Sequence, residues 1–299
     1  LTGFTLQNGF AENGGGACGG TLVQCVLLDN VAGGYGGGAH YGVLRNCELR
    51  GNAANDGGGA YQATLVDCAV SGNRVDGTGG GAGECALTRC RLLDNEAGYA
   101  GGGSAYGLLS ACRLTGNQSG YNGGGAYYGK LANSVLTGNR AEYGGGSFGS
   151  DLTGCTVSGN RAGGTGGGTR YGELFNCIIW GNQASEEDNT YSPSSSSSYN
   201  CTKPVLTSGT GNVGGDPLFL APQEERFELR AGSPCLNAGA NERAEGAADV
   251  AGNARIAGGT VDLGAHEMPD GAGFVGHYVA LEILGRGTVD VSGDRAVAD

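Results

Sequence analysis

Residues 101–119 read GGGSAYGLLSACRLTGNQS, and residues 123–141 read GGGAYYGKLANSVLTGNRA, the same pattern one step further along the chain. Working outward from this pair, the glycine triplet occurs eight times. The copies begin at Gly14, Gly36, Gly57, Gly79, Gly101, Gly123, Gly144 and Gly166. The steps between them are 21 or 22 residues. A fixed period of this length is the signature of a repeat protein.

An Asn and a Cys recur in the same rhythm. The Asn positions are Asn30, Asn52, Asn73, Asn95, Asn117, Asn139, Asn160 and Asn182. Five residues before each stand Cys25, Cys47, Cys68, Cys90, Cys112, Ser134, Cys155 and Cys177. The first glycine of a triplet always lies 11 residues before the Cys position. The one-residue slips therefore fall between the Asn and the next triplet, which predicts a surface turn there.

Around the Cys position, apolar residues alternate with polar ones, as in a strand with one buried face. We expect Leu109, Cys112 and Leu114 to point inward, together with their equivalents in the other copies. A 22-residue unit is too short for a propeller blade but suits one coil of a solenoid, whose strands pair with their equivalents in the next coil. The sequence thus predicts an all-β, single-stranded right-handed parallel β-helix of 21–22-residue coils with a C-terminal cap.

Three residue types have expected local roles. The glycine triplets permit a sharp corner with positive φ. The Asn side chains should tolerate a left-handed turn and bond backbone groups there. The Cys column should be reduced core filler, since a small buried thiol behaves as a hydrophobe. Cys201 and Cys235 lie outside that column and are the better disulfide candidates.

The repeats divide the chain into four expected parts. Residues 1–184 carry the glycine-rich coils, and residues 185–213 form a Ser-rich loop and a return strand. Residues 214–268 form the C-terminal cap, and residues 269–299 begin a further β-rich surface module. The chain opens at Leu1 within patterned sequence. We therefore expect an excised piece that lacks earlier coils and frays or self-associates at that end.

Four motifs follow the repeats in a fixed order. They are DPLF at 216–219, GSPCLNAG at 232–239, GNAR at 252–255 and GGTVDLGAHE at 258–267. Together they resemble the C-terminal signature of bacterial choice-of-anchor Q domain proteins. The GGGA and GN elements resemble polymorphic outer-membrane protein repeats, within the pectin-lyase-like β-helix fold. The resemblance implies an exported protein held at the bacterial cell surface, associated with the outer membrane.

The net charge and the hydrophobic pattern of the sequence limit the classes of partner that the chain is expected to bind. The formal net charge is −12, which disfavours nucleic acid and anionic membrane surfaces. No apolar run approaches the roughly 18 residues of a membrane-spanning helix. An extracellular glycan, or a host or surface protein, is the expected partner.

Exposed tyrosines are the candidate ligand-binding residues, because the tyrosine ring can stack on a sugar ring. They are Tyr41, Tyr61, Tyr106, Tyr128 and Tyr171. The alternative is that these rings only cover and stiffen the sheet. No cofactor is expected beyond a possible structural calcium ion, for which Asp216, Asp249, Asp262 and Glu267 are the candidate ligands.

Signals for catalysis are few. A polysaccharide lyase needs a basic residue and a carboxylate cluster, and a hydrolase needs two carboxylates at a defined separation. Lys occurs only at Lys130 and Lys203, and the repeats show no clustered Asp. The sequence favours a non-enzymatic stalk or adhesin-like module that binds through a sheet face. A polysaccharide-active lyase or hydrolase of the pectin-lyase-like fold is the alternative.

Overall fold

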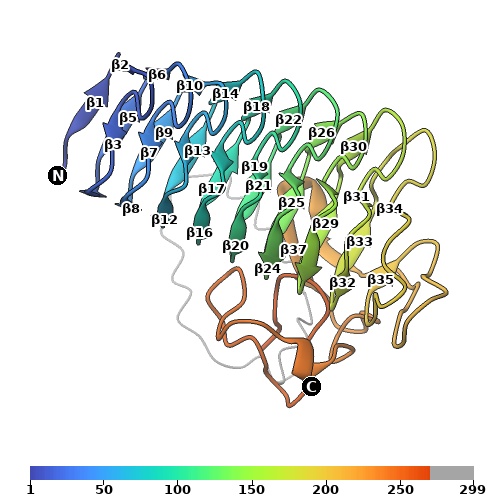
Figure 1. Ribbon diagram of the computed structural model, residues 1–299. Coiled ribbons are helices and arrows are strands. Elements are labelled where there is room, and N and C mark those ends of the chain that lie inside the picture. The colour runs from blue at the N-terminus through green and yellow to red at the C-terminus, as the bar shows by residue number, and fades with distance from the viewer. Residues whose placement is uncertain (270–299) are drawn as a thin grey trace, which may run out of the picture.

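A computed structural model describes residues 1–269, which form a right-handed parallel β-helix (Figure 1). Each coil contributes short strands to four parallel sheets, each named here for the repeat position that its strands contain or directly follow. Of the expected surface module at 269–299, all but Pro269 lies outside the described residues.

The strands of the four sheets stack in coil order. The triplet sheet contains β3 (Ala17–Cys18), β7 (Ala39–His40), β11 (Ala60–Tyr61), β15 (Ala82–Gly83), β19 (Ser104–Ala105), β23 (Ala126–Tyr127), β27 (Ser147–Phe148), β31 (Thr169–Arg170) and β34 (Thr190–Tyr191). The leucine sheet contains β4 (Thr21–Val23), β8 (Val43–Arg45), β12 (Thr64–Val66), β16 (Ala86–Thr88), β20 (Leu108–Ser110), β24 (Lys130–Ala132), β28 (Asp151–Thr153) and β32 (Leu174–Phe175). The cysteine sheet contains β1 (Thr5–Gln7), β5 (Val26–Leu28), β9 (Glu48–Arg50), β13 (Ala69–Ser71), β17 (Arg91–Leu93), β21 (Arg113–Thr115), β25 (Val135–Thr137), β29 (Thr156–Ser158), β33 (Ile178–Trp180) and β35 (Cys201–Thr202). The asparagine sheet contains β2 (Phe10–Ala11), β6 (Val31–Ala32), β10 (Ala53–Ala54), β14 (Arg74–Val75), β18 (Glu96–Ala97), β22 (Gln118–Ser119), β26 (Arg140–Ala141) and β30 (Arg161–Ala162).

Equivalent residues of successive coils pair in register, as Leu109 does with Leu131. The core is therefore a set of columns of like side chains. Leu109 is 3% exposed, and Cys112 and Leu114 are fully buried, which confirms the predicted inside and outside faces. The thiols of the Cys column are free. A hydrogen bond with Cys112 and burial raise the pKa of Cys90 to about 12, so this thiol stays protonated.

The Asn side chains bond backbone groups as predicted, but the Asn is not the left-handed residue. The left-handed residue is the one before the Asn, such as Gly116 with φ of 66° or Asp94 with φ of 51°. The Asn side chain instead points inward, where Asn117 is fully buried. Its Nδ2 donates to Leu92 O at 2.9 Å and to Asn139 Oδ1 at 3.0 Å. Repeated in each coil, these bonds form a continuous amide ladder inside the β-helix.

The glycine triplets make the predicted corner. The first glycine of each triplet has φ between 60° and 71°. The next two leave no room for a side chain: a Cβ on Gly103 would lie 2.5 Å from Gly125 O in the following coil. Glycine is required here both by conformation and by the close approach of adjacent coils.

Residues 185–213 were expected to leave the repeat, but they form a further, irregular coil. β34 pairs with β31, and β35 pairs with β33. Asn189 replaces the missing rung of the amide ladder, since its Oδ1 accepts from Asn182 Nδ2 at 3.0 Å. Asn200 takes the place of the Cys, accepting from Cys177 N at 3.0 Å. The coil continues without the repeat sequence because amide side chains satisfy the same backbone groups.

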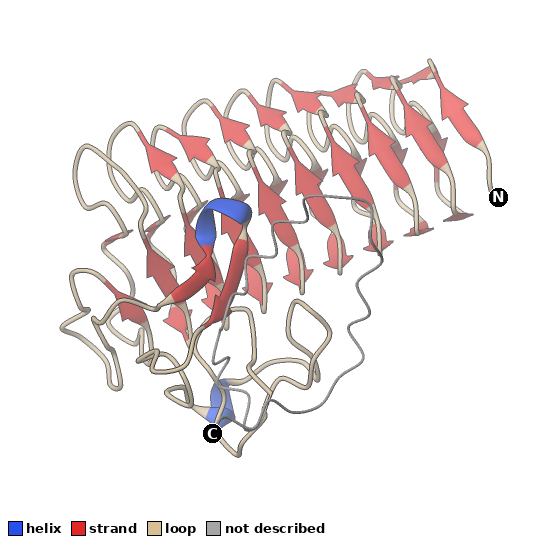
Figure 2. Cartoon of the chain, turned by 180° about the vertical axis from the view of Figure 1, so that it is seen from behind, coloured by secondary structure: helices blue, strands red, loops and turns tan. Residues whose placement is uncertain are grey.

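The C-terminal region packs on the side of the β-helix, whereas a cap on its end was expected. It contains the hairpin of β36 (Phe219–Ala221) and β37 (Arg226–Leu229), and the 3₁₀ turns Pro222–Glu224 and Asn241–Arg243. Figures 1 and 2 show this region beside the later coils. Phe219, Phe227 and Leu229 form an apolar cluster with Val135 and Ile178 of the cysteine sheet. Val135 and Ile178 occupy outward positions of that sheet, and the C-terminal region covers them.

Helices in the described residues are confined to the two 3₁₀ turns, and none is long and apolar enough to cross a membrane.

Candidate functional site

Aromatic side chains cover the outer face of the triplet sheet. They stand in three adjacent columns: the strand position after the buried Ala, the corner that follows it, and the turn before each triplet. Tyr61 belongs to the strand column. The other four predicted residues, Tyr41, Tyr106, Tyr128 and Tyr171, share the corner column, with φ between 46° and 60°. Their exposed fractions run from 38% to 51%. The left-handed corner turns each of these rings outward from the coil.

The rings of the later coils are in continuous contact. Tyr106 and Tyr128 stack at 6.3 Å between centroids, with an interplanar angle of 8°. Phe148 lies 5.9 Å from Tyr128 and 5.3 Å from Tyr171. Tyr171 lies 6.2 Å from Tyr191 in the last coil. We call this set, with Tyr99, Tyr121, Tyr127 and Tyr143, the aromatic face.

A smaller aromatic cluster lies on the earlier coils. Tyr35 and Tyr61 are 4.6 Å apart, and His40 stacks on Tyr41 at 3.9 Å. Gly83 separates this cluster from the aromatic face, and a Cβ there would lie 2.7 Å from the Tyr61 ring. The five predicted tyrosines are therefore divided between two groups of rings.

Arg170 adds a cation to the aromatic face. Its guanidinium carbon lies 4.4 Å from the Tyr143 ring centroid and 4.9 to 5.6 Å from three further rings. Its Nε is buried and has no hydrogen-bond partner within the described residues. The guanidinium held among these rings extends the planar surface of the face, and its Nη2 donates to the Tyr171 hydroxyl at 3.2 Å.

Burial fixes the protonation of two inner hydroxyls. Desolvation, and secondarily a hydrogen bond to Glu84, raises the pKa of Tyr61 well above its usual range. The Tyr61 hydroxyl donates to Glu84 Oε1 at 2.5 Å. Burial likewise raises the pKa of Tyr127. Both phenols stay neutral and keep their hydroxyl protons.

A groove of about 590 Å³ separates the leucine sheet from the turn at 242–246. Lys130 on β24 and Asp151 on β28 occupy opposite positions in the sheet register, and both line the groove. Glu173 lies one coil further on, where its backbone N–H donates to Asp151 Oδ1 at 3.1 Å. Glu242 and Glu245 face this row from the opposite wall.

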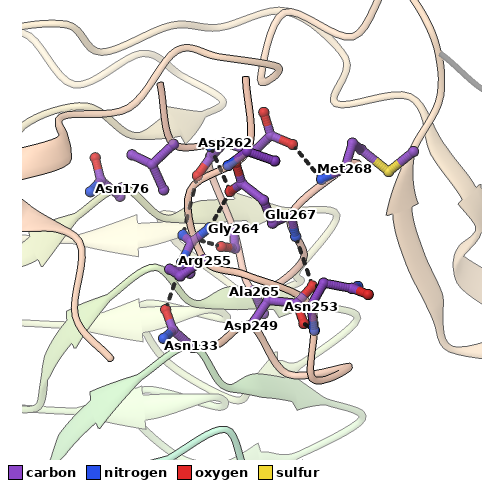
Figure 3. Close-up of polar contacts among 12 residues, drawn as sticks. Asn133, Asn176, Asp249, Asn253, Arg255, Asp262, Gly264, Ala265, Glu267 and Met268 are labelled. Carbon is purple, nitrogen blue, oxygen red and sulfur yellow. Dashed lines mark hydrogen bonds and ion pairs between the residues drawn. The ribbon is translucent and has the colours of Figure 1, made fainter. Parts of the chain in front are cut away.

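Three of the four candidate calcium ligands meet in the C-terminal region, while Asp216 does not join them (Figure 3). Asp216 is exposed and accepts from Leu218 N. Asp249, Asp262 and Glu267 are at most 2% exposed, and Arg255 lies among them. Glu267 Oε2 contacts Arg255 Nη1 at 2.7 Å.

The oxygens of these carboxylates are already occupied by N–H donors. Asp262 accepts from Asn237 N at 2.7 Å and from Met268 N at 2.9 Å. Asp249 accepts from Glu267 N at 2.9 Å. Across residues 1–269, no group of three or more His, Cys, Asp or Glu residues is arranged to hold a metal ion. This geometry gives the predicted ligands a structural role, joining the motifs of the C-terminal region to one another.

The network also attaches the C-terminal region to the β-helix. Arg255 Nε donates to Asn133 Oδ1 at 2.8 Å, and Asn133 Nδ2 donates to Ala248 O at 3.1 Å. Burial lowers the pKa of Arg255. Burial also raises the pKa of Glu267 to about 7, despite its contact with Arg255.

The disulfide expected between Cys201 and Cys235 is not formed, since both thiols are free. They nevertheless belong to one buried cluster. A hydrogen bond with Cys201, together with burial, raises the pKa of Cys235 well above its usual range.

Sequence reasoning missed the row of Lys130, Asp151 and Glu173. Each of the three directly precedes the Leu of its copy. Comparing one repeat position across successive copies would have revealed the row, whereas motif spacing within one copy does not.

No family model and no curated protein matches the chain. Among solved structures, the pectate lyase Pel9A resembles it with a TM-score of 0.41 and 14% sequence identity, over 89% of this chain and 73% of that chain. The β-helix assignment rests on the paired coils described above. The resemblance to choice-of-anchor Q proteins remains a prediction.

Proposed function

We propose that this chain is a β-helical binding module of the bacterial surface, which holds a glycan against the aromatic face. The observation that carries this proposal is the continuous row of rings from Tyr106 to Tyr191, of which Tyr106, Tyr128 and Tyr171 are exposed, on backbone fixed by paired coils. Tyrosine offers a flat apolar ring and a polar tip, and its two side-chain torsions lose little entropy on binding. A rigid row of such rings suits a repeating polymer of sugar rings.

The surface location belongs to the same proposal. It is supported by the order of the four C-terminal motifs, which resembles that of anchored bacterial proteins. Immunolabelling of intact cells that express the native gene would test it, with labelling after permeabilisation alone as the contrary result.

A paired substitution tests the aromatic face. Replacing Tyr106 and Tyr128 together by Ala should lower affinity for glycans that the wild-type chain selects from an immobilised panel at least ten-fold. Leu93→Ala, at an exposed position of the cysteine sheet, is the matched control and should leave affinity unchanged. Equal binding by all three proteins would contradict the proposal.

A second candidate function is polysaccharide cleavage in the groove over the leucine sheet. The observation that favours it is the basic Lys130 beside Asp151 and Glu173 in a concave site. Lyase action would release unsaturated products from a polyuronate, and Lys130→Gln should abolish it while Lys203→Gln does not. If the wild-type chain binds the polymer and leaves its length unchanged, this candidate is wrong.

A further inference from the structure

A second concavity of about 510 Å³ lies on the asparagine sheet and the turn that follows it. Its floor is small and largely backbone, formed by Ala141, Ala162 and Gly163. Arg140 and Arg161 rise from this floor, directly opposite each other on β26 and β30. We call this site the arginine notch.

Two arginines at paired positions of adjacent strands repel each other, since paired strands lie about 4.8 Å apart. Three coils earlier in the same column, an arginine lies opposite a carboxylate instead: Arg74 and Glu96 form an ion pair at 3.5 Å. In the described part of the chain, neither Arg140 nor Arg161 has a carboxylate within ion-pair distance. Within residues 1–269 the repulsion is therefore not offset by an ion pair.

Another arginine pair of the β-helix lies near acidic residues, although neither member has an ion pair within the described residues. Arg91 and Arg113 are opposite each other on β17 and β21. The C-terminal region covers Arg113, where the negative charges of Glu228 and Glu225 act on it. At the arginine notch no such segment is present among the described residues, and both guanidiniums are exposed.

The remaining walls of the notch carry two side-chain amides, one hydroxyl and one carboxylate. Gln118 and Gln183 flank the arginines along the column, and Ser185 and Glu142 line the other side. Glu142 lies over Gly163, not in an ion pair with either arginine. The Glu142 carboxylate would repel a dense polyanion such as nucleic acid. The arginines together with the amides and the hydroxyl suit a ligand whose isolated anionic group is surrounded by hydroxyls.

The notch adjoins the aromatic face. Tyr121 follows Gly120, and Tyr143 follows Glu142, so both turns that line the notch lead directly into the aromatic columns. The Tyr143 ring covers Gly164, where a Cβ would lie 2.6 Å from it. A sugar ring beside the notch would stack on Tyr121, which is 58% exposed, because the Arg170 guanidinium already lies over the Tyr143 ring.

We propose that the arginine notch binds the carboxylate or sulfate group of an acidic glycan whose sugar rings stack on the aromatic face. This inference rests on the proposed glycan-binding function and names the class of glycan. Each guanidinium can hold such a group through two parallel N–H donors, and the paired arginines gain most when the group bridges them.

The test uses one polymer in three charge states: dextran, carboxymethyl-dextran and dextran sulfate. We expect the wild-type chain to bind at least one anionic form ten-fold or more tightly than dextran at low salt. Arg140→Gln with Arg161→Gln should remove that preference and leave binding of dextran unchanged. Arg74→Gln, in the same column but ion-paired, should keep the preference.

The outcomes separate the two proposals. Preference for only one anionic polymer identifies carboxylate or sulfate as the bound group. The proposal for the arginine notch is wrong if the Arg140→Gln, Arg161→Gln chain keeps the anionic preference, or if the wild-type chain shows no such preference. Both proposals are supported if the Tyr106→Ala, Tyr128→Ala chain binds none of the polymers and the arginine double variant loses the anionic preference. If the tyrosine variant keeps the arginine-dependent preference, the aromatic face does not bind the glycan, and only that proposal is wrong. Unchanged unfolding temperatures of the arginine variants show that lost binding is not lost folding.

Discussion

At the residue scale, Leu108 and Leu109 show how sharply a β-coil separates neighbours. Leu109 is 3% exposed and Leu108 is 59% exposed. Leu109→Asp buries an unpaired charge in the core and should lower the free energy of unfolding by several kcal/mol. Leu108→Asp is the matched control and should change it by less than about 0.5 kcal/mol. Urea unfolding measures both, and equal effects would show that the assigned faces are wrong.

These faces were predictable because period-two alternation is local and repeats in every coil. The contacts of Arg255 were not. It bonds Asn133, which lies 122 residues earlier in the chain, and nothing in either local pattern indicates the partner. The arginine notch lies between these cases, since its two arginines occupy the position after the Asn in successive copies.

His266 gives a pH-dependent prediction. Burial, and then the charge of Arg113, lowers its pKa to about 4. The unfolded chain therefore binds a proton below about pH 6.5 that the folded chain does not bind. The stability from His266 is complete above that pH and is lost as the pH falls toward 4. Relative to wild type, His266→Gln should gain up to about 3 kcal/mol at low pH.

Urea unfolding of both proteins across this pH range measures the effect. Glu267 acts with the opposite sign, because its pKa is raised to about 7 and its contribution is lost as the pH rises toward that value. The free energy of unfolding of the wild-type chain should therefore vary less with pH than either residue alone would make it vary. A constant difference between His266→Gln and wild type would contradict the prediction.

At the scale of the element, the amide ladder joins the coils from inside. The Oδ1 of Asn117 accepts from Asn95 N at 3.0 Å and from Asn95 Nδ2 at 2.9 Å. Asn117→Ala would leave these donors, and Leu92 O, buried without a partner. We expect a loss of about 3–5 kcal/mol, from about 1–3 kcal/mol for each unsatisfied group. Gln118→Ala, at the exposed neighbour, should have little effect in the same urea titration.

The ladder also explains where the sequence-based boundaries were wrong. The coil at 185–213 keeps the hydrogen bonds of the repeat with Asn189 and Asn200 at new spacings. Sequence periodicity cannot reveal such a coil, because this coil keeps the hydrogen bonds of the repeat but not the spacing between its residues. The position of the C-terminal region was missed for a related reason. Apolar outward residues such as Val135 and Ile178 indicate a covered face, but do not say which segment covers it.

At the scale of the whole molecule, the coils of the β-helix have a core of their own, and a second apolar cluster joins the C-terminal region to the cysteine sheet. Arg255→Met would leave Glu267 buried without its cation, which should weaken docking by about 3–5 kcal/mol. Limited proteolysis should then cut within residues 203–269, while hydrogen exchange of the earlier coils stays slow. Arg226→Met removes only an exposed ion pair at 4.0 Å and should leave proteolysis unchanged. Loss of protection throughout the chain would show that the core and this cluster unfold together.

In-register pairing of the coils has a genetic consequence. A crossover between two copies of the repeat that removes residues 62–83 would join Tyr61 to Glu84, and Asn52 would meet Asn95 as its next rung. Every inward position would remain inward, because Tyr61 and Gly83 are already paired equivalents. Gly83, which now separates the two groups of rings, would be lost with the deleted codons. Unequal recombination in such a gene can thus change the spacing of the two groups of rings by one coil at a time, while every remaining coil keeps a paired neighbour.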